Sequence, residues 1–147
     1  MPKYVLDTNV YIDGLGSESG AIGLKRFLGT HLGRTFLSAV VVQELRVGAR
    51  TPSQIDALAE GILIPFERRR RLFAPSPRAF AECGRVLVDL IGREGIVYAD
   101  TSRSLVNDVL LAVSCREHGI TLVTADGAFK MIARHLKGFR HVLPFPR

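Results

Sequence analysis

Tyr4-Val5-Leu6-Asp7-Thr8-Asn9 is the stretch around which the sequence is organised. Its apolar residues predict a short buried strand, and a carboxylate, a hydroxyl and an amide follow directly. Alone, this polar triplet is equally typical of a turn or of a helix cap, which is the simpler interpretation. Its meaning therefore depends on whether acidic residues from distant parts of the chain can meet Asp7.

A second apolar strand that stops on an acid lies near the other end of the chain, where Ile120-Thr121-Leu122-Val123 is followed by Thr124-Ala125-Asp126. Between the two, Thr35-Phe36-Leu37 predicts a strand that ends on Ser38. Strands that alternate with helical segments predict an α/β fold with a central, mainly parallel sheet of four or five strands flanked by helices. Ligands bind such sheets beyond the carboxyl ends of the strands, where Asp7 and Asp126 are expected.

Glu44 lies in a helix predicted for residues 39–50, on the same face as Val40, Val41 and Val47. An ionised carboxylate on an apolar face is unfavourable unless it is paired or bound to a cation. A salt bridge to an arginine is the simple explanation, and a bound cation is the functional one.

Asp108 lies in a helix predicted for residues 104–115, which is apolar nearly all round and is therefore expected to be central and buried. Asp100 or Ser102 is the expected cap at its start, and Gly119 is the expected cap at its end. Asp108 is thus a second carboxylate on an apolar helix face, and it precedes the strand that ends before Asp126.

Four carboxylates, those of Asp7, Glu44, Asp108 and Asp126, can therefore converge at one edge of the sheet. Such groups raise one another's pKa unless a divalent cation neutralises them. Oxygen ligands favour Mg²⁺ or Mn²⁺, and the four histidines show no zinc-ligand spacing. Carboxylate-bound Mg²⁺ can activate a water and stabilise a phosphate leaving group, so the pattern points to phosphodiester hydrolysis.

Length and composition indicate an ordinary folded chain. We expect residues 1–147 to form a single domain, and the 47% hydrophobic content is typical of a globular protein. No apolar run approaches the roughly 20 residues that span a bilayer, so no membrane association is expected. Cys83 and Cys115 lack a CxxC spacing, which suits a reducing compartment and predicts a cytoplasmic location. The formal charge of +6 favours a polyanionic partner, with nucleic acid as the first candidate.

Two further stretches invite functional interpretations. Arg68, Arg69, Arg70 and Arg71 are consecutive, and such a run most often forms a solvated face; the functional alternative is contact with RNA phosphates or with an acidic partner. The glycine-rich residues 14–20 do not fit the dinucleotide motif G-x-G-x-x-G, because the third glycine comes one position late. We predict a flexible linker there.

Four sequence blocks together resemble the PIN-domain ribonucleases, and more narrowly the VapC-type toxins of bacterial toxin-antitoxin pairs. The blocks are VLDTN (5–9), SAVVVQEL (38–45), NDVLLA (107–112) and TLVTAD (121–126), and the similarity covers essentially the whole chain. The resemblance implies a PIN-like three-layer fold and an acidic metal-binding and catalytic quartet of Asp7, Glu44, Asp108 and Asp126, with Thr8, Asn9, Ser38, Asn107 and Thr124 as supporting polar neighbours. It also implies RNA cleavage, a homodimer and an antitoxin that covers the active site.

The predicted function is therefore metal-dependent endoribonuclease activity, as the toxin of a toxin-antitoxin pair, and three alternatives stay open. A haloacid-dehalogenase-type phosphatase needs a second Asp where Asn9 stands. A PIN nuclease of RNA processing outside any toxin system shares the same site, and neighbouring genes would separate the two. A non-catalytic RNA-binding or partner-binding module fits the charge but leaves Glu44 and Asp108 unexplained.

Overall fold

The computed structural model describes residues 1–97 and 103–144, and within them five strands form one parallel sheet. The expected helix caps Asp100 and Ser102 lie outside the described residues. The strand order is β3-β2-β1-β4-β5, and every neighbouring pair is parallel. The strands are β1 (Lys3–Leu6), β2 (Thr35–Ser38), β3 (Leu72–Phe73), β4 (Ile120–Val123) and β5 (His141–Val142). The predicted α/β fold with a parallel sheet is confirmed.

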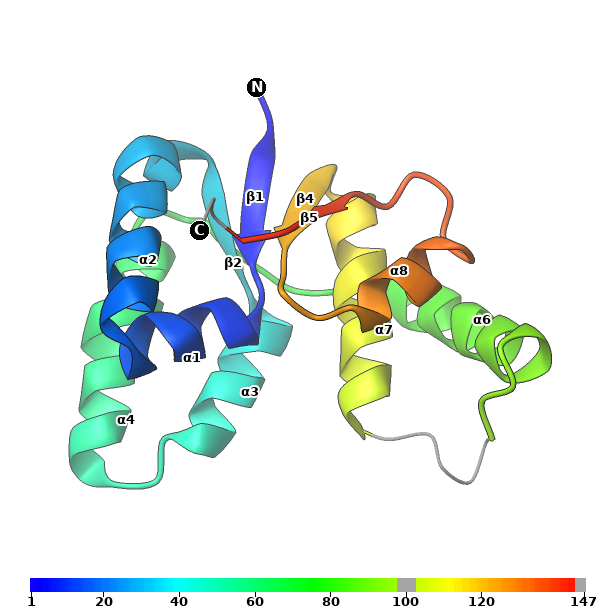
Figure 1. Ribbon diagram of the computed structural model, residues 1–147, viewed down its shortest axis with the longest axis horizontal. Helices are drawn as coiled ribbons and strands as arrows, with labels where there is room; N and C mark the ends of the chain where they lie inside the picture. The colour runs from blue at the N-terminus through cyan, green and yellow to red at the C-terminus, as the bar shows by residue number, and fades with distance from the viewer. Residues whose placement is uncertain (98–102, 145–147) are drawn as a thin grey trace.

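Helices cover both faces of this sheet, which gives three layers (Figure 1). One side carries the helices that connect β1 to β2 and β2 to β3, and α6 to α8 lie on the other side. The helices are α1 (Thr8–Gly16), α2 (Glu18–His31), the 3₁₀ turn η1 (Leu32–Arg34), α3 (Ala39–Gly48), α4 (Pro52–Leu58), the π-helical turn η2 (Ala59–Leu63), α5 (Ile64–Arg68), α6 (Pro77–Arg93), α7 (Arg103–Glu117) and α8 (Ala128–Ala133). Among the described residues, no helix is both long and apolar enough to cross a membrane.

The strand order reverses at β1. The chain moves outward from β1 to β2 and β3, then returns to add β4 on the other side of β1. In parallel α/β sheets, the carboxyl ends of the strands at such a reversal leave an opening in which ligands bind. Leu6, the last residue of β1, pairs with Val123, the last residue of β4. Asp7 and Thr124, which follow these residues, therefore lie next to each other.

Helix α7 forms the centre of the second helical layer. Its Val109, Leu111, Ala112 and Cys115 are fully buried, as the apolar pattern predicted. The helix packs against α6 and leads directly into β4. Gly119 has a φ of 66°, a left-handed conformation that glycine adopts without strain, and the predicted helix end is confirmed.

The glycine-rich residues 14–20 are not a flexible linker, and this prediction is wrong. Helix α1 continues to Gly16, and Ser17 caps α2 by accepting a hydrogen bond from the Gly20 backbone N–H at 3.0 Å. A Cβ atom on Gly20 would lie 2.3 Å from the backbone oxygen of Asp13. Glycine is needed here because α1 and α2 approach each other closely. A flexible linker and a close helix contact both favour glycine, so composition alone does not separate them.

The predicted face of α3 is partly wrong. Val40, Val41 and Leu45 are buried, whereas Val47 is 64% exposed. The buried face of α3 is therefore centred one position away from the predicted one, and Glu44 lies half-buried at its margin. That position lets the Glu44 carboxylate reach across to α1.

Gly20→Ala is expected to lower the free energy of unfolding by about 1–3 kcal/mol, because the added methyl group overlaps the Asp13 carbonyl. Gly16→Ala is the matched control, since nothing lies within 4 Å of a Cβ at that position. Urea denaturation of both variants measures the difference. Equal stabilities would contradict the close packing of α1 on α2.

Candidate active site

Asp7 follows β1, and three donors hold its carboxylate. Its Oδ1 accepts from the Thr8 backbone N–H at 2.8 Å. Its Oδ2 accepts from the Asn9 amide at 3.0 Å and from the Thr124 hydroxyl at 2.8 Å. The side chain also caps α1, so the simple interpretation of the opening triplet holds as well. Asp7 is only 3% exposed, and its orientation is fixed by residues from both ends of the chain.

Asn9 and Thr124 join the carboxyl ends of β1 and β4. The Asn9 amide oxygen accepts from the Ala125 backbone N–H at 3.2 Å, and its amide nitrogen also donates to the Thr124 hydroxyl at 3.3 Å. The Thr124 hydroxyl in turn accepts from the Asp126 backbone N–H at 3.0 Å. These contacts set the position of Asp126 relative to Asp7.

Asp126 is exposed, and its Oδ1 accepts from the Ala128 backbone N–H at 2.9 Å, so it also orders the turn into α8. Its negative charge nevertheless raises the pKa of both Asp7 and Asp108. Asp126 thus lies within electrostatic reach of two other members of the predicted quartet.

Glu44 reaches the site from α3. Its Oε1 accepts from the Thr8 hydroxyl at 2.8 Å, which links α3 to α1. Within residues 1–97 and 103–144, Glu44 forms no ion pair, so the arginine salt bridge considered from the sequence is not found there. Ser38 is buried, and its hydroxyl accepts from the Val40 backbone N–H at 3.1 Å and starts the helix that carries Glu44.

Asp108 and Asn107 come from α7. Burial raises the pKa of the Asp108 carboxyl to about 7, and the charges of Asp7, Asp126 and Glu44 add to the effect in that order. Asn107 is half-buried, and hydrogen bonding from its side chain partly offsets the raised pKa of Glu44. Helix α7 therefore contributes one carboxyl group whose ionised form is unfavourable, that of Asp108, and one amide, that of Asn107, which stabilises the ionised form of Glu44.

The pKa values of Asp7 and Glu44 are also raised, first by burial and then by the charge of a neighbouring carboxylate. Burial is the first cause of the raised pKa of Asp7, which hydrogen bonds from Thr124, Thr8 and Asn9 oppose. Burial is also the first cause of the raised pKa of Glu44, and the charge of Asp7 adds to it. Each of these carboxyl groups is thus affected by another member of the quartet, so the structure brings together four acids that are far apart in sequence.

The cluster is not a preformed metal cage. In the described part of the chain, no three Asp, Glu, His or Cys side chains lie close enough to hold one ion. The donor chemistry nevertheless fits Mg²⁺ or Mn²⁺, because every candidate ligand is an oxygen atom and the buried Asp108 carboxyl has no cationic partner among the described residues. Glu44 and Asp126 are less buried than Asp7 and Asp108, so they have the freedom to turn toward an ion.

Cys115 is a neighbour that the sequence interpretation left out of the site. Its thiol is fully buried, and burial together with the charge of Asp7 raises its pKa. Cys115 is therefore a buried, uncharged neighbour of Asp7. It shares a face of α7 with Asp108, and that spacing is the signal that could have placed it here.

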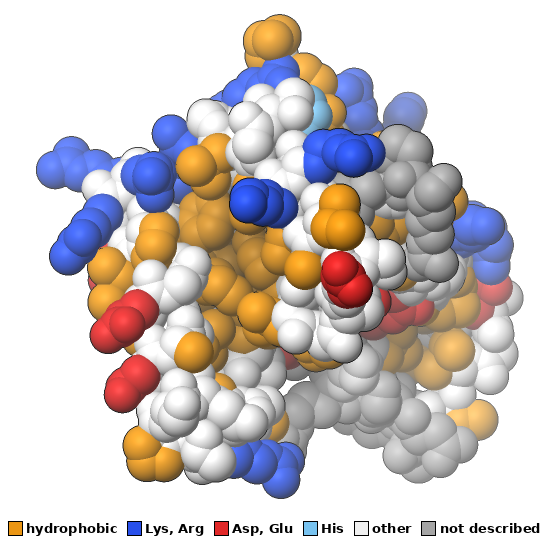
Figure 2. Space-filling view, turned by 60° about the vertical axis from the view of Figure 1, so that its left-hand side comes forward, with side chains coloured by type: hydrophobic (Ala, Val, Ile, Leu, Met, Phe, Trp, Pro, Cys, Tyr) orange, Lys and Arg blue, Asp and Glu red, His pale blue; other side chains and the backbone are white. Residues whose placement is uncertain are grey.

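The arginine run lies away from these acids. The Arg71 guanidinium donates to the Leu32 carbonyl in η1, which precedes β2. Arg69 donates to the Pro65 carbonyl at 3.2 Å. Arg68 to Arg71 are therefore near the amino ends of the strands, whereas the acids are at the carboxyl ends. Most Lys and Arg side chains on the face shown in Figure 2 lie in its upper half, and β1 begins at the upper end of the molecule in Figure 1.

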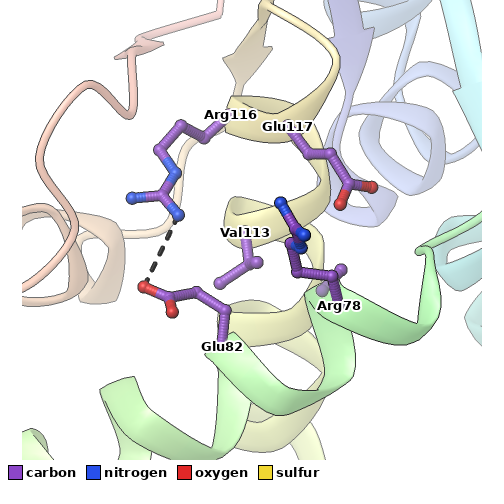
Figure 3. Close-up of a pocket in the computed structure, with 6 residues that line it drawn as sticks. Arg78, Glu82, Val113, Arg116 and Glu117 are labelled. Carbon is purple, nitrogen blue, oxygen red and sulfur yellow. Dashed lines mark ion pairs between the residues drawn. The ribbon is translucent and has the colours of Figure 1, made fainter.

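A pocket between α6 and α7 is separate from the acidic cluster (Figure 3). Arg116 in this pocket forms an ion pair with Glu82 at 3.5 Å, and Glu117 accepts a hydrogen bond from the Ser76 hydroxyl. The lining residues are Arg78, Ala79, Glu82, Val113, Arg116 and Glu117. The carboxylates of this pocket are engaged by neighbouring side chains. The acidic cluster is therefore the stronger candidate site.

The PIN domain family profile matches residues 4–135, a range that contains all four acids. The chain therefore belongs to the PIN domain family, and the resemblance seen in the sequence blocks is confirmed. No curated protein sequence matches the chain significantly.

Solved structures share the fold over nearly the whole chain. FitAB bound to an IR36 DNA fragment has a TM-score of 0.72 at 18% identity, covering 98% of this chain and 96% of the other. DNA-bound VapBC from Salmonella typhimurium has a TM-score of 0.70 at 20% identity, covering 97% and 98%. VapBC2 from Rickettsia felis, bound to a promoter DNA fragment, has a TM-score of 0.66 at 20% identity, covering 95% and 97%. These similarities show that the chain shares the fold of these proteins.

Asp108→Asn is expected to raise the free energy of unfolding of the metal-free protein at neutral and higher pH. The pKa of this carboxyl rises from its ordinary 3.8 to about 7 on folding, so between these values the folded state keeps a proton that the unfolded state releases. The stability of the wild type therefore falls as the pH rises through this window, by at most about 4 kcal/mol.

Asparagine carries no charge, so the advantage of the variant grows from about pH 4 to about pH 7 and is absent below that range. Thermal unfolding in EDTA at both ends of the window measures it. An advantage that does not change with pH would contradict the raised pKa of Asp108.

Proposed function

We propose that this protein is a Mg²⁺- or Mn²⁺-dependent endoribonuclease that hydrolyses RNA phosphodiester bonds. The observation that carries the proposal is the cluster of Asp7, Glu44, Asp108 and Asp126, in which burial and the charges of neighbouring carboxylates raise the pKa of Asp7, Glu44 and Asp108. Such mutual repulsion is relieved when a divalent cation binds. Membership of the PIN domain family, whose members are generally nucleases, supports the same chemistry.

In this proposal, Asp7, Glu44, Asp108 and Asp126 hold the cation. When bound, the cation lowers the pKa of a water that attacks phosphorus and offsets the charge that develops on the phosphate. Thr8 supports both Asp7 and Glu44, one through its backbone N–H and the other through its hydroxyl. Asp108 holds a proton at its carboxyl near neutral pH and gives it up when the positive charge enters.

The positive charge of the chain supports a polyanionic substrate. The four clustered acids are among only 14 acidic residues, against 20 Lys and Arg, so the surface outside the site is strongly basic. Such a surface attracts phosphate backbones over distances of about 10 Å at ordinary ionic strength. We propose RNA as the substrate because the VapC-type toxins that the sequence blocks resemble cleave RNA.

We further propose that the protein is the toxin of a toxin-antitoxin pair and that a cognate antitoxin binds it. Ile12 on α1, Leu15 on α1 and Ile22 on α2 are each more than half exposed. Figure 2 shows hydrophobic side chains gathered in a hollow on the side where α2 and α4 lie. Exposed apolar surface of this kind is typical of a protein interface. A homodimer, a single domain over residues 1–147 and a cytoplasmic location belong to the same proposal.

Asp7→Asn is expected to lower the rate of RNA cleavage roughly 100-fold or more, because the loss of one charged ligand weakens the stabilisation of the transition state by several kcal/mol. Asp56→Asn is the matched control, since Asp56 is exposed on α4 and outside the cluster. A fluorescently labelled RNA is incubated with wild type and both variants, with Mg²⁺ or with EDTA. Wild-type cleavage that survives EDTA, or full activity of Asp7→Asn, would refute the mechanism.

The same assay tests the partner. Co-expression with the product of the adjacent gene is expected to abolish cleavage by the wild type, and removal of that product is expected to restore it. A catalytically active protein that no neighbouring gene product inhibits would instead support a PIN nuclease of RNA processing.

A further inference from the structure

The backbone at Arg70 has a conformation that glycine usually occupies. Arg70 has a φ of 55° and is the only non-glycine residue with a positive φ in the described part of the chain. It follows the end of α5, where its N–H donates to the Glu67 carbonyl and the Arg71 N–H donates to the Phe66 carbonyl, both at 3.0 Å. This pair of bonds is the Schellman motif, and Arg70 occupies its left-handed position.

An arginine is unfavourable at this position for folding. Glycine adopts left-handed backbone angles freely, whereas a residue with a Cβ atom is strained there. The Arg70 side chain is exposed, and no carboxylate among the described residues forms an ion pair with it. The folded chain thus gains no contact from this guanidinium that offsets the strain, which points to a ligand outside the chain.

Arg70 belongs to a run of arginines that is linked to a further arginine in η1. Arg71 donates to the Leu32 carbonyl of η1, and Arg34 lies in the same turn, with its guanidinium 2.6 Å from the His31 ring. We call Arg34 and residues 68–71 the amino-end cluster. None of these arginines forms an ion pair within the described residues, so their guanidinium groups remain able to bind phosphates.

The amino-end cluster lies at the opposite end of the sheet from the acids. Asp7 follows the last residue of β1, whereas the Leu32 carbonyl that binds Arg71 precedes the first residue of β2. A strand of four residues spans roughly 13 Å. One phosphate therefore cannot contact both places, but an RNA chain that passes around the β3 edge of the sheet can.

We propose that the amino-end cluster binds backbone phosphates of the RNA several nucleotides away from the bond that is cleaved. The proposal rests on the proposed ribonuclease function and adds a minimum length to its substrate. RNA fits this surface better than an acidic protein does, because no large hydrophobic side chain in residues 64–73 is exposed. Protein interfaces need an apolar centre, whereas phosphate binding needs only accessible cations.

Arg70→Gly separates binding from folding. Glycine suits the left-handed position, so we expect the melting temperature to stay the same or rise, while RNA binding weakens several-fold. Binding is measured in EDTA by fluorescence anisotropy, with a single-stranded RNA of about 30 nucleotides at several salt concentrations. The loss of one phosphate contact is expected to reduce the slope of log affinity against log salt by roughly 0.7 to 1.

Two variants serve as controls. Arg93→Ala removes the same charge from the end of α6, on the other side of the sheet, and is expected to leave the salt slope unchanged. Arg70→Lys keeps the charge and is expected to restore most of the lost affinity. An equal loss of affinity in Arg70→Gly and Arg93→Ala would reduce the effect to net charge and overturn the proposal. Unchanged RNA binding in Arg70→Gly, with weaker binding to a protein partner, would assign the cluster to that partner instead.

RNA length gives a second readout. Arg70→Gly is expected to lower kcat/KM several-fold more for the long RNA than for an RNA of about four nucleotides, mainly through KM. Equal effects on both lengths would contradict a contact distant from the cleaved bond. If neither RNA is cleaved by the wild type while binding still depends on Arg70, the proposed ribonuclease function fails and the phosphate-binding cluster stands.

Discussion

Mutual repulsion among buried carboxylates is the constraint on which the rest of this structure depends. Asp7 and Asp108 are buried, Glu44 is half-buried, and burial raises the pKa of all three before their charges act on one another. A fold that only had to be stable would replace such a cluster with apolar residues. The surrounding hydrogen bonds instead hold it in place. Asn9 and Thr124 join the carboxyl ends of two strands that are more than a hundred residues apart in sequence, and both donate to the same oxygen of Asp7.

The sheet topology makes this arrangement available. Because β1 lies between β2 and β4, the residues that follow all three strands meet at one edge. Asp7 and Asp126 come from the strand ends, Glu44 comes from the helix that Ser38 starts, and Asp108 comes from the buried helix that leads into β4. The arginines that follow α5 lie toward the amino ends of the strands, away from the acids. The two ends of one sheet thus differ in charge, and a long nucleic acid is the kind of ligand that can contact both.

The sequence was sufficient to predict the parallel sheet, its helical layers and the residues that meet at its carboxyl end, because strand ends and helix faces are local patterns. It was insufficient where distant packing decides the outcome. Residues 14–20 have the composition of a linker, and only the contact of Gly20 with Asp13 shows why glycine is needed there. Val47 was assigned to the buried face of α3 but is exposed. Two neighbouring faces of this short helix carry similar numbers of apolar residues, so the sequence pattern does not decide which one is buried. The left-handed backbone of Arg70 follows from the end of α5 and has no signal in an arginine run.

Divalent-cation affinity as a function of pH tests the central claim most directly. Mn²⁺ binding to the wild type is measured by calorimetry at about pH 8 and at about pH 5.5, without RNA. Because Asp108, with a pKa of about 7, must lose its proton to bind the ion, the affinity is expected to fall roughly 30-fold at the lower pH. The absence of binding at the higher pH, or equal affinity at both values, would contradict a cation-binding role for the carboxylate cluster.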